Sequence, residues 1–226
     1  MLSGQCVRAY AGGMPSVTRR RPADREARRH DAQTRLLAAV ERLVADGESF
    51  TEISIERIVA EAGMARSTYY VYFADKGDLL RGWFAEITDE LRDAAATWWQ
   101  LREPVVFDDV RVALAGIVDT YRPHTPLMAA LYDTAAYDPS VREMVAAMMD
   151  ENIAGLRSHI RRGQAAGFID PTLSRAETAS WLTWMAERGL HQLVRDASDT
   201  EVVRLVDAYA RIVWNTLYRP VTTTSA

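Results

Sequence analysis

The stretch "GMARSTYYVYFADK", residues 63–76, concentrates side chains that can bind a nucleic acid. It holds one arginine, Arg66, two small hydroxyl residues, three tyrosines and, at its end, Lys76, the only lysine of the chain. A guanidinium can bind the edge of guanine, while hydroxyl and ammonium groups can bind phosphate oxygens. The segment therefore offers a dense set of polar contacts to a polyanion.

Side chains that could carry catalysis are sparse by comparison. The histidines do not pair with one another or with cysteine at metal-ligand spacing: His30, His124, His159 and His191. Glu187 and His191 are four residues apart and could form an acid–base pair. An ion pair on a helix surface or at a dimer interface explains them better. Cys6 lies in a segment where a nucleophile would lack support. We expect no enzyme, no metal site and no cofactor.

The composition limits the kind of protein. The 226 residues are 48% hydrophobic, which is enough for a globular core without disulfides or metals. The formal net charge of -4 argues against nonspecific binding of nucleic acid over the whole surface. No apolar run approaches the roughly 18 residues of a membrane span, and the first residues do not resemble a signal peptide. We expect a cytoplasmic protein that does not enter the membrane.

Positive charge is concentrated near the start, in "TRRRPADREARRH" at residues 18–30. Six arginines stand there against Asp24 and Glu26, with no sustained apolar period. We interpret residues 1–30 as a flexible basic arm. Such an arm either follows DNA phosphates or is an unstructured solvated extension, and the sequence leaves both open.

Helical periodicity dominates the rest of the chain, and no strand pattern of convincing length appears. The helix in "RLLAAVERLVADG" is expected to stop at Gly47, and Ser54 is expected to cap a short helix that ends at Gly63. We therefore predict an all-α fold. A second short helix is expected at about residues 66–73, and longer ones at about 78–99, 107–121, 125–136, 139–166, 174–195 and 199–219.

Two short helices joined by a glycine-containing turn form a helix-turn-helix arrangement. Tyr69 and Phe73 share one face of the second helix, which we expect to pack on the first helix. Arg66 and Tyr70 share another face, and an exposed helix of this size fits the major groove. Lys76 would bind a phosphate as a point charge. The alternative is that an arginine-biased composition left one lysine by accident.

At this point the sequence "FTEISIERIVAEAGMARSTYYVYFADKGDLL" closely resembles the DNA-binding region of TetR-family transcriptional regulators. The resemblance covers about residues 34–82. It includes the T-x-I-S start, the A-x-x-A-G turn, the S-T-aromatic-Tyr-x-Tyr-Phe core and the closing lysine. This combination is far more specific than a helix-turn-helix pattern alone.

The resemblance implies particular contacts with DNA. Base or near-base contacts are implied for Arg66, Ser67 and Tyr70, and phosphate contacts for Ser54, Thr68, Tyr70, Tyr72 and Lys76. One residue departs from the family pattern, because Ala65 stands where many members have serine or threonine. That change removes a helix cap, which costs about 1 kcal/mol, and puts one backbone contact in doubt.

The resemblance also implies a larger helical domain that senses a ligand and forms a dimer. We divide the chain into the arm, a helix-turn-helix DNA-binding domain at residues 31–77, a ligand-binding and dimerisation domain at 78–220, and a tail at 221–226. Two late stretches, "ETASWLTWMAERGL" and "IVWNTLYRP", are similar to a mycobacterial repressor of the same family.

The last two helices are apolar on more than one side, which predicts burial on two sides. In a small domain the second side can face a partner subunit, so that two helices from each copy form a four-helix interface. The alternative is that both helices lie in the centre of one core. The residues expected at the dimer interface are Trp181, Leu182, Val203, Ala210 and Trp214.

A cavity for a small molecule is predicted among the larger helices. Methionine adapts to irregular apolar shapes, and one amide could orient a ligand. Ordinary core packing is the alternative for each residue taken singly. The residues expected to bind the ligand are Tyr121, Met128, Met148, Met149, Asn152, Thr183 and Trp184, which together suggest a largely apolar effector of moderate size.

These expectations combine into one functional hypothesis. The resemblance implies a homodimer that binds a pseudo-palindromic site in double-stranded DNA through two recognition helices. We expect a repressor that a small effector releases from its operator, with the 78–99 helix as the lever. Two other classes stay open, a protein-interaction module of the same fold and a small helical enzyme. Neither accounts for Arg66, Tyr70 and Lys76 together.

Overall fold

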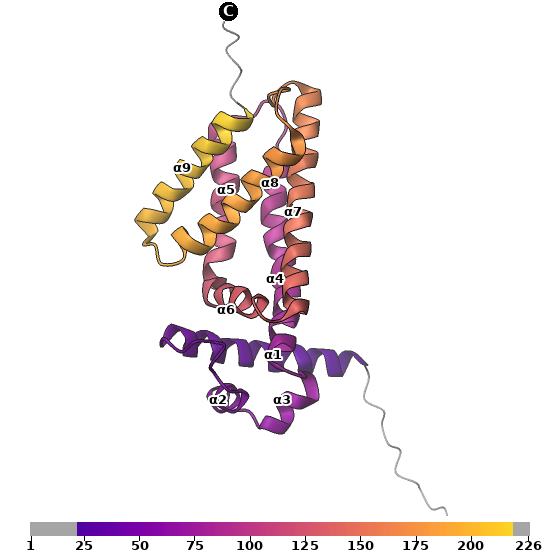
Figure 1. Ribbon diagram of the computed structural model, residues 1–226, viewed down its shortest axis with the longest axis vertical. Helices are drawn as coiled ribbons and strands as arrows, with labels where there is room; N and C mark the ends of the chain where they lie inside the picture. The colour runs from indigo at the N-terminus through magenta and orange to yellow at the C-terminus, as the bar shows by residue number, and fades with distance from the viewer. Residues whose placement is uncertain (1–21, 219–226) are drawn as a thin grey trace, which may run out of the picture.

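The computed structural model describes residues 22–218, and within them it contains helices and turns without strands (Figure 1). The predicted all-α fold is confirmed. The helices are α1 (Pro22–Ala45), α2 (Ile55–Glu61), α3 (Arg66–Tyr72), α4 (Lys76–Trp99), α5 (Phe107–Tyr121), α6 (Thr125–Ala135), α7 (Pro139–Ala166), α8 (Arg175–Gly189) and α9 (Asp199–Leu217). A 3-10 turn (Arg122–His124) precedes α6, and a π-turn (Leu190–Val194) extends α8.

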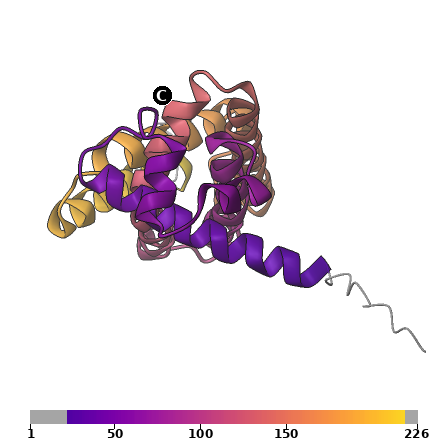
Figure 2. The ribbon, with the colours of Figure 1, turned by 90° about the horizontal axis from the view of Figure 1, so that it is seen from below.

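The molecule has a small lower part and an elongated upper part (Figure 1). The lower part holds α1, α2 and α3, and α4 rises from it into a bundle with α5, α7, α8 and α9. Figure 2 shows α1 lying across the lower end of this bundle, with its N-terminal turns projecting beyond it. The predicted helix at 174–195 is correct in extent, but its last turn widens into the π-turn.

The expectation of a flexible arm is wrong for residues 22–30, which form the first turns of α1. Residues 25–31 have no buried side chain, which is why apolar periodicity did not reveal these turns. Polar contacts with α4 accompany them instead: Arg29 lies 3.6 Å from Asp78, and His30 lies 3.3 Å from Glu86. Residues 1–21 and 219–226, which include Cys6, most of the expected arm and the tail, lie outside the described residues.

A tightly packed core positions the two short helices. Tyr69 of α3 and Phe73, which directly follows α3, are buried with Ile58 and Val59 of α2 and the apolar face of α1, which confirms the inward pair. The Tyr69 hydroxyl donates to the Asp75 carbonyl oxygen at 2.8 Å, so the ring satisfies its polar atom inside the core. These contacts fix the orientation of α3 and leave its other face exposed.

Side chains of α1 form hydrogen bonds and an ion pair with the end of α2 and the turn that joins it to α3. The Arg35 guanidinium donates to the carbonyl oxygen of Ala62 at 3.0 Å, and Arg42 pairs with Glu61 at 2.9 Å. Gly63 has a positive φ of 63°, which a glycine adopts without the cost that a side chain brings. The helix-turn-helix angle is therefore set by the backbone of the turn and by its contacts with α1.

A buried hydrogen-bond network closes the upper end of the bundle. The Trp98 indole N–H donates to the Tyr218 hydroxyl at 3.0 Å, and Nε2 of His159 lies 2.7 Å from the same oxygen. Nδ1 of His159 lies 2.9 Å from the Trp99 carbonyl oxygen, so it carries the proton and Tyr218 donates to Nε2. This chain joins α4, α7 and the end of α9. Burial lowers the pKa of His159 to about 4, which keeps it neutral at pH 7.

One hydrophobic cluster crosses the expected boundary between the two domains. It joins the core of the helix-turn-helix to Tyr121, Met128, Met148 and Met149 of the upper bundle. The helix α4 begins at Lys76, before the expected boundary at residues 77 and 78, and α1 packs against both α4 and α6. The lower part is therefore packed onto the bundle rather than tethered to it.

Candidate DNA-binding surface and effector cavity

The exposed face of α3 presents the side chains expected to contact bases. Arg66, Ser67 and Tyr70 are exposed, and the Arg66 guanidinium lies over the Tyr70 ring, 5.5 Å from its centroid. Arg66 also pairs with Glu56 of α2 at 2.7 Å. An exposed ion pair of this kind contributes little to stability, whereas a bidentate arginine–guanine contact is the commonest specific contact with a base. DNA can therefore displace Glu56 at low cost.

The residues expected to contact phosphates occupy less uniform positions. Ser54 caps α2 by accepting from the Arg57 amide at 3.1 Å, which leaves its hydroxyl hydrogen available to a phosphate. Thr68 and Tyr72 are half-buried on the sides of α3. Ala65 stands at the N-cap of α3 without a side-chain hydrogen bond, as its identity dictates. Contacts from these residues to DNA stay predictions.

Lys76 has an additional role that the sequence did not suggest. Its ammonium donates to the carbonyl oxygens of Phe50 at 2.8 Å, Thr51 at 3.0 Å and Ile53 at 2.8 Å. These bonds use all three of its hydrogens and fasten the first turn of α4 to the loop before α2. Partial burial lowers the pKa of Lys76. A phosphate contact from Lys76 stays a prediction, and it would compete with these carbonyls.

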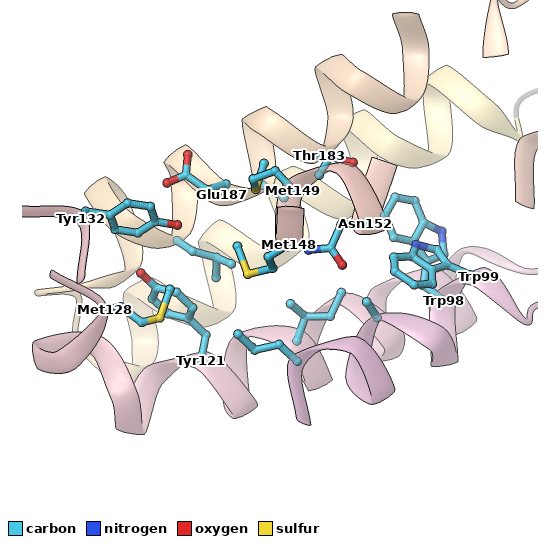
Figure 3. Close-up of a pocket in the computed structure, with 15 residues that line it drawn as sticks. Trp98, Trp99, Tyr121, Met128, Tyr132, Met148, Met149, Asn152, Thr183 and Glu187 are labelled. Atoms are coloured by element: carbon cyan, nitrogen blue, oxygen red, sulfur yellow. The ribbon is translucent and has the colours of Figure 1, made fainter. Parts of the chain in front are cut away.

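The upper bundle contains a cavity of about 90 Å³ (Figure 3). Its walls include these expected ligand-binding residues: Tyr121, Met128, Met148, Met149, Asn152 and Thr183. Trp184 was assigned to the cavity wrongly, because it lies on the exposed outer side of α8. Adjacent residues on a helix point about 100° apart, so Thr183 faces inward while Trp184 faces out.

The structure adds wall residues that the sequence did not single out. Figure 3 shows Tyr132 and Glu187 near Tyr121 at one end, and Trp98 and Trp99 at the other. Glu187 follows Thr183 by four residues and so shares its face, which is the signal that could have found it. The tryptophans come from the end of α4, and no local pattern places them beside α8.

Glycine lets α7 approach one of these tryptophans. A Cβ on Gly155 would lie 2.6 Å from an atom of the Trp99 ring, which is inside van der Waals contact. The absence of a side chain at this position therefore sets how closely the Trp99 ring lies against α7. That ring forms part of the cavity wall at its aromatic end.

A second hollow, of about 210 Å³, opens between α8, the π-turn and α9. It is lined almost wholly by apolar side chains, including the exposed Met185, Leu193 and Ile212. It shares Trp98, Ile117, Ala186 and Leu190 with the first cavity. The two spaces are therefore neighbours, separated by side chains that belong to both.

The residues expected at the dimer interface differ in their exposure. Trp181 and Val203 are 74% and 58% exposed, so they are free to meet a partner. Leu182 and Ala210 were assigned wrongly, because both are buried in the core of the same chain. Trp214 is half-buried and packs edge-on against Phe107, with ring centroids 6.1 Å apart.

Comparisons with known proteins agree with this architecture. Residues 110–219 match the family model for the C-terminal domain of the transcriptional regulator EthR. The chain is 24% identical over 192 residues to the HTH-type transcriptional regulator EthR of Mycolicibacterium smegmatis, covering 83% of this chain and 87% of that protein. The chain is therefore similar, over most of its length, to a helix-turn-helix transcriptional regulator.

Solved structures share the TetR-family fold at low sequence identity. The regulator PfmR from Thermus thermophilus superposes with a TM-score of 0.66 at 17% identity, covering 82% of this chain and 99% of that one. A putative transcriptional regulator from Saccharomonospora viridis, in complex with choline, gives 0.64 at 17% identity, covering 84% and 99%. Among the described residues, no helix is both long and apolar enough to cross a membrane, and no group of three or more potential metal ligands occurs.

Proposed function

We propose that this chain is a homodimeric, sequence-specific repressor of the TetR family that leaves its operator when a small molecule fills the cavity of the upper bundle. The observation that carries the DNA-binding part is the division of α3 into two faces. Tyr69 and Phe73 are locked in the core, while Arg66, Ser67 and Tyr70 stand exposed. A rigidly held helix with an exposed arginine suits recognition in the major groove.

Dimerisation through the last two helices fits the exposed apolar surface of the upper part. Large apolar side chains of α8, the π-turn and α9 are open to solvent: Trp181, Trp184, Met185, Leu193, Val203 and Ile212. Exposed apolar side chains gathered on neighbouring elements mark interaction surfaces. A twofold pairing would cover these side chains and place one recognition helix at each end of a pseudo-palindromic site.

The packing supports a route from the cavity to the DNA-binding surface. Met128, Met148 and Met149 line the cavity and belong to the cluster that forms the core of the helix-turn-helix. A molecule that pushes these side chains apart must shift α6, α7 or the lower half of α4. Tyr69 of α3 bonds to Asp75 at the start of α4, and Lys76 of α4 bonds to the loop before α2. Because of these bonds, a shift of α4 would change the spacing of the two α3 helices from the roughly 34 Å groove repeat.

The experiment is a selection from random DNA duplexes with three proteins, each first shown to be folded and dimeric. The natural chain should enrich an inverted repeat, and Arg66→Ala with Tyr70→Ala should not. The control is Arg161→Ala, which removes an exposed arginine of α7, far from α3. If the natural protein enriched no sequence, sequence-specific DNA binding would be refuted, and binding to a partner protein would be favoured instead.

A further inference from the structure

The polar groups of the cavity are unevenly placed. Tyr121 of α5, Tyr132 of α6 and Glu187 of α8 meet at one end, opposite the rings of Trp98 and Trp99 (Figure 3). The remaining wall is largely aliphatic or thioether, interrupted by one amide and one hydroxyl. A ligand in this space would therefore bind with a defined direction, a polar group at one end and an apolar body along the wall.

Two of these polar groups lack a partner within the part of the chain that the structure describes. The Tyr121 hydroxyl and Oε2 of Glu187 are buried, and neither makes a hydrogen bond to the protein. Buried polar atoms are nearly always bonded, because an unpaired one costs about 1–3 kcal/mol. Tyr121 is only 3% exposed, so its hydroxyl cannot turn out to bulk water.

The carboxylates of Glu187 and Asp133 lie around this end, and so do Arg188 and Arg195, which both lower the pKa of His191. Glu187 forms no ion pair with any described basic residue. His191 on the next turn is held neutral, because burial lowers its pKa more than Glu187 raises it. Arg188 and Arg195 are exposed, and Arg195 lies 3.8 Å from Asp196 instead.

We propose that this end of the cavity binds the protonated amine of an amphipathic effector, with its N–H groups donating to Glu187 and to the Tyr121 hydroxyl. The proposal rests on the proposed effector-sensing function and names the chemical class of the effector. A carboxylate only accepts hydrogen bonds, so an ammonium satisfies both its charge and its free oxygen. A neutral alcohol would satisfy the hydrogen bond alone, and an anion would be repelled.

The aromatic surroundings favour the same class. The faces of tyrosine and tryptophan attract cations, by about 0.5–2 kcal/mol depending on how far the site is desolvated. Two such rings, those of Tyr121 and Tyr132, line the end of the cavity that holds Glu187 (Figure 3). The pKa of Tyr121 and that of Tyr132 are raised by burial and then by Glu187, so both hydroxyls keep their protons at neutral pH.

The volumes indicate how long the effector is. A cavity of about 90 Å³ holds about three waters, whereas a benzene-binding cavity measures about 150 Å³. The ammonium group of the effector and a few of its carbon atoms fit the 90 Å³ cavity. The tail of a longer molecule would pass Ile117, Ala186 and Leu190 into the 210 Å³ apolar hollow, which shares these walls. The effector is thus an amine with a linear or narrow apolar tail.

Titration calorimetry with a matched series tests the amine directly. The probes are 1-aminooctane, 1-octanol and octanoate at pH 7.5, measured on the natural protein, Glu187→Gln, Tyr121→Phe and the control Glu143→Gln, which alters an exposed carboxylate of α7. We expect the natural protein to prefer the amine over the alcohol by about tenfold or more. Glu187→Gln should lose about 10- to 100-fold in amine affinity with little change for the alcohol.

Equal binding of amine and alcohol by the natural protein would overturn the proposal, as would an unchanged preference in Glu187→Gln. Operator release is measured separately with the same probes. If the amine binds as expected but the operator is not released, the regulatory function fails while the site stands. If operator binding is intact and the octyl probes show no preference for the amine, the site assignment fails while the DNA-binding function stands.

Discussion

The hydrogen-bond chain at the top of the bundle predicts an unusually large effect for the loss of one oxygen atom. Replacing Tyr218 by phenylalanine removes the acceptor of the Trp98 N–H and the donor to Nε2 of His159. His159 is fully buried and Trp98 is 4% exposed, so water cannot replace the hydroxyl. Each of the two buried groups left unpaired costs about 1–3 kcal/mol, which gives a combined loss of about 2–6 kcal/mol.

Urea unfolding at pH 7.5 and fixed protein concentration measures this loss, since dimer stability depends on concentration. The control is Tyr137→Phe, because Tyr137 is 58% exposed and should change stability by less than about 0.5 kcal/mol. A shift of the midpoint at unchanged slope is expected for Tyr218→Phe. If the two variants were equally stable, the network would contribute nothing to stability, and the reasoning would be refuted.

Other predictions concern titration, the lysine contacts and the two faces of α8. The unfolding free energy should fall as the pH drops from about 6.5 towards 4. In this range His159 takes up a proton in the unfolded chain but stays neutral in the folded protein, where its pKa is about 4. Urea midpoints of the natural protein and of His159→Phe, compared over this range, test the prediction. Lys76→Met should destabilise the fold by about 1–3 kcal/mol. The same variant tests the phosphate contact through the slope of the logarithm of operator affinity against the logarithm of salt concentration. The slope should fall by about one if Lys76 binds a phosphate, and stay unchanged if its role is structural only. Trp181→Ala should weaken the dimer, as measured by sedimentation, without lowering the stability of the monomer. Leu182→Ala should lower the free energy of unfolding by about 2–5 kcal/mol. Equal behaviour of the two variants would refute the assignment of the two faces of α8.

Helix positions were predictable from the sequence because each long helix buries one continuous stripe. The spacing of Tyr69 and Phe73 fixed which side of α3 is buried, and the structure agrees. The start of α1 was missed for the same reason, since residues 25–31 bury nothing and apolar periodicity is silent there. Contacts of Arg29 and His30 with α4 become visible only in three dimensions.

Sites built from several helices were predictable only in part. The methionines and Asn152 of α7 could be assigned to one face, but which face of α8 opposes them could not, and Trp184 was placed on the wrong side. Leu182 and Ala210 were assigned to an interface because apolar residues look alike whether they meet the same chain or a partner. Glu187 was interpreted as a surface or interface charge, since helical spacing cannot show that a neighbouring helix covers it.

The hydrophobic cluster that runs from the helix-turn-helix into the bundle has a consequence for engineered hybrids. Suppose the helix-turn-helix part, cut at residue 77, is fused to another protein. It would bring only half of a packed surface, because the side chains of α6 and α7 that complete it, among them Leu131 and Met148, would be left behind. A functional chimera must therefore contain side chains in both halves that pack against each other, and a linker of suitable length is not enough. On the proposed function, the DNA-binding helices and the effector cavity adjoin this packed surface, so exchanging either half means redesigning the contact between them.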